Sequence, residues 1–190
     1  MVTRDELIQT IHHLIGEDLI EKANQIDENA NGVQIHGADE VSKIALGVSI
    51  SLDFFREAVA SGAQFTLTHH GLHLSPKYMY NSRLDRSQQA VLKYVFAHNL
   101  TVAGYHYSLD AHPEIGNNAT IIKLLGAKKL DIPYFEGWGW VGEFESPTDV
   151  KKIAAKLAAI TSHDVFAVYG GPTKVKRIGV CSGGGKPTGI

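Results

Sequence analysis

Apolar and polar positions along the first two-thirds of the chain follow two different periods. From Leu7 to Ile15 apolar residues recur every three or four positions, which predicts an amphipathic helix. A capping box formed by Thr3 and Glu6 marks the start of this helix. Shorter apolar runs predict buried strands at residues 43–51, 64–69 and 100–106. Helical spacing predicts further helices at residues 53–62, 86–98 and 115–125, the first of them capped by Asp53.

The order of these elements indicates the fold class. Strands alternate with helices, which is the pattern of an α/β protein with a mixed, partly parallel sheet flanked by helices. The Asn- and Gly-rich segment 27–37 is predicted to be a loop. In sheets with parallel strands, ligands bind at the carboxyl ends of the strands. Polar side chains that follow the predicted strands are therefore the first candidates for a functional site.

The pattern of residue types in the sequence changes after Pro133. Aromatic residues and glycines alternate from Tyr134 to Phe144, as in an exposed or edge hairpin. A helix after Pro147 is followed by short strand candidates at residues 165–169 and 175–181. We therefore predict an α/β lobe at residues 1–130 and a second β/α lobe at residues 131–190.

The end of the second lobe is expected to be cut short. A buried strand that runs into a glycine-rich loop normally continues into a helix, but little sequence follows the glycines here. Gly183–Lys186 lacks the spacing of a phosphate-binding P-loop. The remaining functional interpretation of this segment is a nest of backbone N–H groups that binds an anion.

Composition and charge narrow the classes of function. The 190 residues are 44% hydrophobic and 20% charged, which is ordinary for a globular protein. A formal net charge of −2 gives no strong attraction to nucleic acid or anionic lipid. The single cysteine, Cys181, excludes an intramolecular disulfide and fits a reducing compartment. Without a membrane-spanning apolar run or a signal-peptide pattern, we expect a soluble, cytoplasmic protein.

Histidines are concentrated in one part of the chain. Six of the ten lie between His69 and His112. The pair His69–His70 comes at the end of one strand candidate, and His106 and Asp110 come at the end of the next. Imidazole and carboxylate groups together bind divalent metals such as Zn, Fe, Mn, Ni or Co. Because both groups of residues follow strand ends, we predict that they converge on one metal site, which makes residues 1–130 a metal-binding lobe.

Two arrangements of the histidine pair remain open. Adjacent residues of a strand point to opposite faces, so His69 and His70 serve a single ion only if they lie past the strand's end. Alternatively each binds its own ion in a two-metal centre, with the ions about 3.5–4 Å apart. The second arrangement is typical of hydrolytic enzymes.

Other polar residues near these segments are weaker candidates. We expect some of them to support the site or to lie in its loops; they are His73, His112 and Glu114. Asn118 lies in a segment that offers either an N-cap for the following helix or an amide near the metal loop. Gln34 belongs to a turn with two amides, and on its own this segment is only a turn.

Several of these segments together resemble a known family. In order along the chain they are Asn31-Gly-Val-Gln34, Thr68-His-His-Gly-Leu72, His106-x-x-Leu-Asp110 followed by Ala-His-Pro-Glu-x-Gly-Asn-Asn118, and Cys-x-Gly-Gly-Gly at 181–185. The set resembles the GTP cyclohydrolase I type 2 homologue family, or Nif-three-like proteins, from about residue 5 to residue 185. The resemblance is specific because several motifs agree in sequence, spacing and order.

The resemblance implies a dinuclear metal site inside a toroidal homohexamer, built as a trimer of dimers. It implies that His69 and His70 each reach a metal, and that His106 and Asp110 complete the coordination of one of them. The family's remaining ligands are a His and a Glu four residues apart near the C-terminus. No such pair follows Gly185, so the chain is expected to lack a C-terminal segment.

Two functions of different classes follow from these expectations. The first is a metal-dependent hydrolase with two divalent transition-metal ions, acting on a small nucleotide-like or cyclic amide substrate. The second is a metal-binding oligomeric or regulatory module without turnover. The expected partners are other copies of the chain and a small molecule, and not a membrane or nucleic acid.

Overall fold

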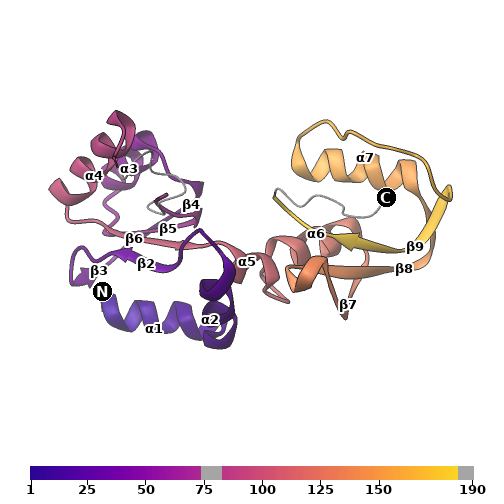
Figure 1. Ribbon diagram of the computed structural model, residues 1–190, viewed down its shortest axis with the longest axis horizontal. Coiled ribbons are helices and arrows are strands. Elements are labelled where there is room, and N and C mark those ends of the chain that lie inside the picture. The colour runs from indigo at the N-terminus through magenta and orange to yellow at the C-terminus, as the bar shows by residue number, and fades with distance from the viewer. Residues whose placement is uncertain (74–82, 184–190) are drawn as a thin grey trace. The chain divides into compact units, whose positions relative to one another are not determined.

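The chain folds into two compact units. The computed structural model describes residues 1–73 and 83–183, and its units are Met1–Leu109 and Asp110–Ile190 (Figure 1). From the change in residue pattern after Pro133, we had expected the boundary between the two lobes near residue 130. The observed boundary comes earlier in the chain than the predicted one because helix α6 (Asn117–Leu125) packs on the strands of the second unit. This helix contributes Ile122 and Leu125 to the core of that unit.

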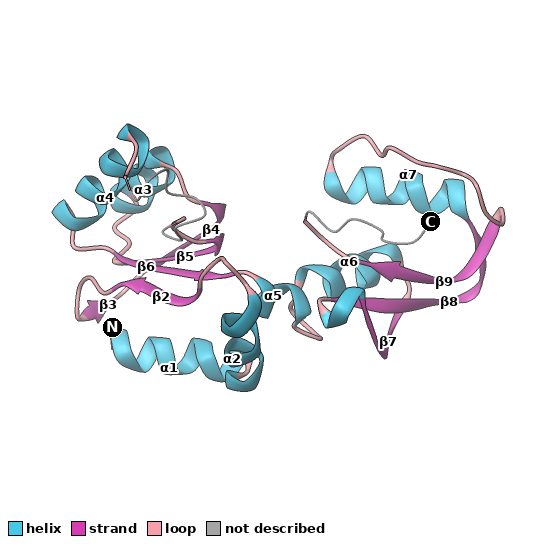
Figure 2. Cartoon of the chain, in the orientation of Figure 1, coloured by secondary structure: helices cyan, strands magenta, loops and turns pink. Residues whose placement is uncertain are grey.

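The first unit is built on a four-stranded mixed sheet. Its strands, in spatial order, are β2 (Asn31–Ile35), β6 (Thr101–Tyr105), β5 (Phe65–His70) and β4 (Ile44–Ser49). Strands β4, β5 and β6 are parallel, and β2 is antiparallel to β6. The expected α/β class with a partly parallel sheet and flanking helices is confirmed, and Figure 2 shows the helices on both faces of this sheet.

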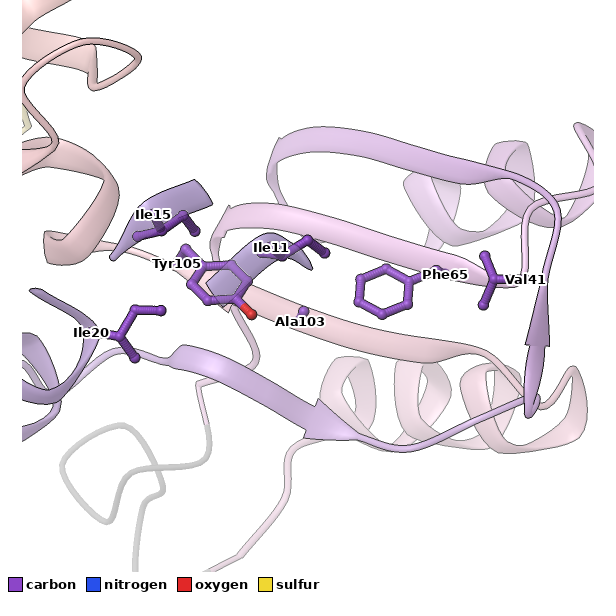
Figure 3. Packing of buried hydrophobic residues seen from close by; sticks show 7 residues of the cluster. All are labelled: Ile11, Ile15, Ile20, Val41, Phe65, Ala103 and Tyr105. Carbon is purple, nitrogen blue, oxygen red and sulfur yellow. The ribbon is translucent and has the colours of Figure 1, made fainter. Parts of the chain in front are cut away.

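Two pairs of helices bury the two faces of this sheet. They are α1 (Arg4–Ile15) and α2 (Glu17–Ile26) on one face, and α3 (Leu52–Ala60) and α4 (Arg86–Ala97) on the other (Figure 1). Ile11, Ile15 and Ile20 pack with Phe65 and Tyr105 in the core beneath α1 and α2 (Figure 3). A short ladder of β1 (Val2–Thr3) and β3 (Glu40–Val41) closes one end of this core. Both faces of the parallel strands are thus covered, as parallel sheets require.

The second unit is an antiparallel sheet with helices packed on it. Its strands are β7 (Lys128–Tyr134), β8 (Gly139–Asp149) and β9 (Lys174–Val180), in that order, with a short 3-10 turn η2 (Phe135–Gly137) between the first two. Its helices are α6 and α7 (Val150–Thr161), and helix α5 (Tyr107–Ala111) contains the boundary between the units. Helix α6 approaches β8 closely at Gly142, where an added Cβ would lie 2.7 Å from Ile122 Cγ2.

One polar segment was predicted wrongly, and another was not predicted. The segment predicted as a loop at 27–37 contains β2, because pairing with β6 uses backbone groups and its side chains, such as Asn31 and Gln34, make polar contacts instead of showing an apolar alternation. The helix α2 was not predicted, and it is separated from α1 by Gly16 at φ 98°. Polar strands and short amphipathic helices carry a weak periodic signal.

Three local predictions also need correction. Helix α3 is capped by the Ser51 side chain, which accepts from Phe54 N, and not by Asp53. Helix α6 has Gly116 as its N-cap, so the asparagines lie inside its first turn. The described residues 165–169 form no strand. The two caps lie at helix ends, where sequence patterns are least specific.

The predicted glycine-rich anion nest at Gly183–Lys186 lies, beyond Gly183, outside the described residues. Within residues 1–73 and 83–183, no helix is long and apolar enough to span a bilayer.

Candidate metal centre

The ends of two neighbouring parallel strands bring three histidines together. Strands β5 and β6 run in the same direction, with Thr68 opposite Gly104. Their carboxyl ends therefore lie at the same edge of the sheet, where β5 ends in His69 and His70 and His106 directly follows β6. The strand pairing, rather than any contact between the histidines, thus sets the position of the cluster.

The three imidazoles form a compact group. One nitrogen from each of His69, His70 and His106 lies within 4.8 Å of the other two. Ring centroids are 4.7 Å apart for the adjacent pair, and 4.9 Å and 5.4 Å from His69 and His70 to His106. His69 is buried and the other two are half-buried. Although adjacent strand residues normally point to opposite faces, these two rings meet at the strand's end.

His70 is held by the neighbouring strand. Its Nδ1 lies 2.8 Å from Oγ of Ser49, which is the residue opposite it on β4. A histidine whose Nδ1 takes part in a hydrogen bond coordinates a metal through Nε2, and the bond fixes the orientation of the ring.

His106 is held by a carboxylate from the other side of the sheet edge. Its Nδ1 lies 2.8 Å from Oδ2 of Asp27, the C-cap residue of α2, and 3.3 Å from Nδ2 of Asn29. Burial raises the pKa of Asp27, but hydrogen bonds from His106 and three further donors outweigh it and leave this pKa below its ordinary value. Asp27 is therefore an ionised, buried acceptor beside the histidine cluster.

Asn31 anchors the backbone of the same segment. Its Oδ1 accepts from the backbone N–H of His106 (3.0 Å) and of Ser108 (3.0 Å) and from the Ser108 hydroxyl (2.8 Å). Its Nδ2 donates to Asp27 Oδ2 at 2.9 Å. Asp27 was not among the site residues predicted from the sequence. A visible signal was the recurrence of short polar side chains at Asp27, Asn29 and Asn31, a residue type that often bonds to nearby backbone groups in turns.

Gln34 has a structural role that its turn-like surroundings did not suggest. Its Oε1 accepts from Leu72 N at 2.6 Å and its Nε2 donates to Leu72 O at 2.9 Å. This pair of bonds ties β2 to the segment that follows His70. Gly71 permits the approach, because a Cβ there would lie 2.3 Å from Gln34 Oε1.

The remaining candidates are His73 in the first unit and His112 and Glu114 in the second. His73 is exposed, and its carbonyl accepts from Gln88 Nε2 at 3.4 Å. His112 Nδ1 accepts from the backbone N–H groups of Glu114 (3.2 Å) and Ile115 (3.1 Å), which closes a turn. Glu114 is exposed. The described contacts of His112 are thus those of a residue that shapes a loop.

Asp110 and Asn118 belong to the second unit. Asp110 Oδ1 accepts from Asn117 Nδ2 at 2.9 Å and from the Ser182 hydroxyl at 2.7 Å. The fully buried Asn118 donates to the carbonyls of Asp110 and Trp138 and accepts from Ser182 N, so it joins three segments and does not cap its helix. Burial, and then the charge of Asp110, raise the pKa of the Cys181 thiol. Cys181 is therefore a poor nucleophile.

The chemistry of the cluster fits a transition-metal ion. Neutral imidazoles are preferred ligands of Zn, Fe, Co and Ni, and two of the three rings already have Nδ1 in a hydrogen bond that would orient them. Nitrogen ligands about 2.0–2.1 Å from a tetrahedral ion lie roughly 3.3 Å apart. The three nitrogens lie within 4.8 Å of one another, so they could serve as ligands of one ion or of two neighbouring ions.

The chain is similar to several known proteins. Residues 3–188 match the family described as Duf34/NIF3 (NGG1p interacting factor 3). The chain is 31% identical over 191 residues to the GTP cyclohydrolase 1 type 2 homolog of Haemophilus influenzae, covering 95% of this chain and 70% of that protein. It is 35% identical over 164 residues to the protein of the same name from Pyrococcus abyssi, covering 84% of this chain and 64% of that one.

A solved structure is similar over nearly the whole chain. The protein ybgI, described as being of unknown function, superposes with a TM-score of 0.83 at 30% identity, and the match covers 97% of this chain and 71% of that one. The chain therefore spans about two-thirds to seven-tenths of the length of these relatives.

Proposed function

This chain belongs to the Duf34/NIF3 (NGG1p interacting factor 3) family, as its motifs predicted, and on that premise we propose that it is a dinuclear metal-binding protein and a metal-dependent hydrolase. The observation that carries the proposal is the cluster of His69, His70 and His106, with one nitrogen of each within 4.8 Å of the others. Three imidazoles brought this close together from two strand ends form a set of nitrogen ligands that suits divalent transition metals.

Asp110 and a second ion enter the proposal from the family resemblance alone. A carboxylate is a suitable ligand beside imidazole for Zn, Fe, Mn, Ni or Co. Within its own unit Asp110 accepts two hydrogen bonds, which would orient a coordinating carboxylate. We therefore propose His69, His70, His106 and Asp110 as the metal ligands of this chain.

The proposed reaction is hydrolysis of a small nucleotide-like or cyclic amide substrate. A bound divalent metal polarises the group under attack and activates water at neutral pH. The chain's own residues position the histidines: Ser49 and Asp27 hold the rings of His70 and His106, and Gln34 holds the backbone that follows His70. The names of the relatives, GTP cyclohydrolase 1 type 2 homolog, make GTP the first substrate to examine.

The experiment measures metal content and hydrolysis in the same preparation. Purified protein is loaded with zinc, iron, manganese, nickel or cobalt, and its bound metal is counted by elemental analysis. Turnover of GTP, other nucleotides and cyclic amides is then compared with and without a chelator. We expect about two ions per chain, and hydrolysis that the chelator abolishes.

A matched pair of variants separates the site from other histidines. His70→Ala is expected to lose at least half of the bound metal, whereas His13→Ala, on the exposed side of α1, is expected to keep it. Full metal content in His70→Ala would refute the site. Tightly bound metal with no turnover on any substrate would favour the metal-binding module without catalysis, and Asp110→Asn tests the fourth ligand.

The proposed assembly is a homohexamer, a trimer of dimers, as the family resemblance implies. Light scattering coupled to gel filtration would then give a mass about six times 20.7 kDa. A monomer at all concentrations would refute this part of the proposal and leave the metal site untouched.

A further inference from the structure

A buried carboxylate lies directly beside the histidine cluster without belonging to it. Asp27 is 79 residues away from His106 in the chain, yet its Oδ2 lies 2.8 Å from His106 Nδ1. The Asp27 side chain is only 2% exposed, and that of His106 is 15% exposed. The contact is therefore shielded from water, where a hydrogen bond to an ionised group is strong.

The position of Asp27 is unfavourable for a carboxylate considered alone. It is the C-cap residue of α2, where the helix presents its carbonyl end and disfavours negative charge. Five donors offset this cost: the His106 ring, the side chains of Asn29 and Asn31, and the backbone N–H groups of Asn29 and Tyr107. These donors therefore hold the Asp27 carboxylate at a helix end that by itself disfavours it.

The contact decides where the imidazole proton lies. An ionised carboxylate only accepts, so His106 Nδ1 must carry a hydrogen to bond with Asp27. The neighbouring amide Nδ2 of Asn29, at 3.3 Å, would require the opposite, a lone pair on Nδ1. The carboxylate prevails, because its bond is shorter and charge-assisted. With the proton on Nδ1, the lone pair of a neutral imidazole is on Nε2.

We propose that Asp27 is a positioning residue for the metal: it keeps the proton of His106 on Nδ1, orients the ring, and so presents Nε2 as the metal-binding nitrogen. The inference rests on the proposed metal-binding function. It extends the site to a residue outside the ligand set and predicts which tautomer the metal-free protein has.

Asn31 shows that this role is distinct from simple support of the chain. Asn31 Oδ1 already accepts from the backbone N–H groups of His106 and Ser108, and also from the Ser108 hydroxyl. To this segment Asp27 adds one backbone bond, from Tyr107 N–H, and the bond to the imidazole ring. The ring contact is therefore the contribution of Asp27 that Asn31 does not supply.

The test reads the tautomer first. Long-range proton–nitrogen correlation spectra of metal-free, nitrogen-labelled protein identify the protonated ring nitrogen of His106, assigned with His106→Gln. Spectra are recorded at about pH 8.5, well above the ordinary pKa of histidine. We expect the Nδ1–H form in the native sequence and in Asp27→Asn, which keeps an acceptor oxygen. In Asp27→Ala the Asn29 amide is the remaining neighbour of Nδ1, so we expect the Nε2–H form.

The second measurement is the zinc affinity of each variant, determined by competition with a chromophoric chelator. We expect Asp27→Ala to bind zinc about 10–100-fold more weakly, with Asp27→Asn between it and the native protein. Asp18→Asn, on the exposed side of the same helix, is the matched control and should bind like the native protein.

Each outcome decides a separate point. An Nε2–H form of His106 in the native protein overturns the inference, even if Asp27→Ala does not fold. Unchanged tautomer and unchanged affinity in a folded Asp27→Ala also overturn it. A native protein that binds no zinc or other divalent metal defeats the proposed function, and the tautomer measurement still tests the role of Asp27.

Discussion

Gln34 offers a direct test of how the segment after the histidine pair is held. Its amide forms two hydrogen bonds with the backbone of Leu72, at 2.6 Å and 2.9 Å, across 38 residues of sequence. Leu72 is buried and packs in the core beneath α3 and α4. Replacing Gln34 by Ala removes both bonds and leaves the N–H and C=O groups of Leu72 to find other partners.

The expected cost follows from these two bonds. A neutral hydrogen bond contributes about 0.5–1.5 kcal/mol net, so the pair contributes about 1–3 kcal/mol. Gln34 is half-buried, and water can replace part of what is lost, which places the cost of Gln34→Ala in the lower half of that range. The loss is local, so it should be seen first in the segment that contains Leu72.

Hydrogen exchange at the Leu72 amide is the most direct assay. In the native protein this amide should be protected by Gln34 Oε1, and in Gln34→Ala it should exchange about 5–30-fold faster, the factor that 1–2 kcal/mol represents. Urea unfolding gives the global change, and zinc affinity shows whether the histidines move. Gln9→Ala, on an exposed position of α1, is the control. Equal protection of Leu72 in both variants would refute the reasoning.

Three further variants test the packing around the site. Tyr105→Phe should be neutral or stabilising by about 1 kcal/mol in thermal denaturation, because the buried Tyr105 hydroxyl has no hydrogen-bond partner among residues 1–73 and 83–183; a clear loss would contradict this. Gly104→Ala should cost about 1–3 kcal/mol and weaken zinc binding, since its Cβ would lie 2.7 Å from Gly71 Cα, and native affinity and stability would refute the close contact. Thr3→Ala should cost about 1 kcal/mol by removing the capping box of α1, with zinc affinity unchanged; a change in zinc affinity would show that the end of α1 influences the site.

The strands and helices that carry apolar residues at a regular spacing could be predicted from the sequence. The run at 64–69 became β5, the run at 100–106 became β6, and the helix predicted at 86–98 is α4, each with small shifts at its ends. Burial imposes these periods on a sequence, so they are visible without a structure. The convergence of His69 and His70 with His106 could be predicted for the same reason, because the ends of parallel strands share one edge of a sheet.

The order of residues by itself therefore determined the fold class, the family, and the histidines that form the cluster. Only the tertiary structure revealed that Asp27 holds the ring of His106, that Gln34 clamps Leu72, and that the polar segment of β2 pairs with β6. The physical reason is the nature of the interactions. Hydrophobic burial repeats along a helix or strand and leaves a period in the sequence, whereas a hydrogen bond between two distant side chains depends on a single pair of positions that the fold brings together.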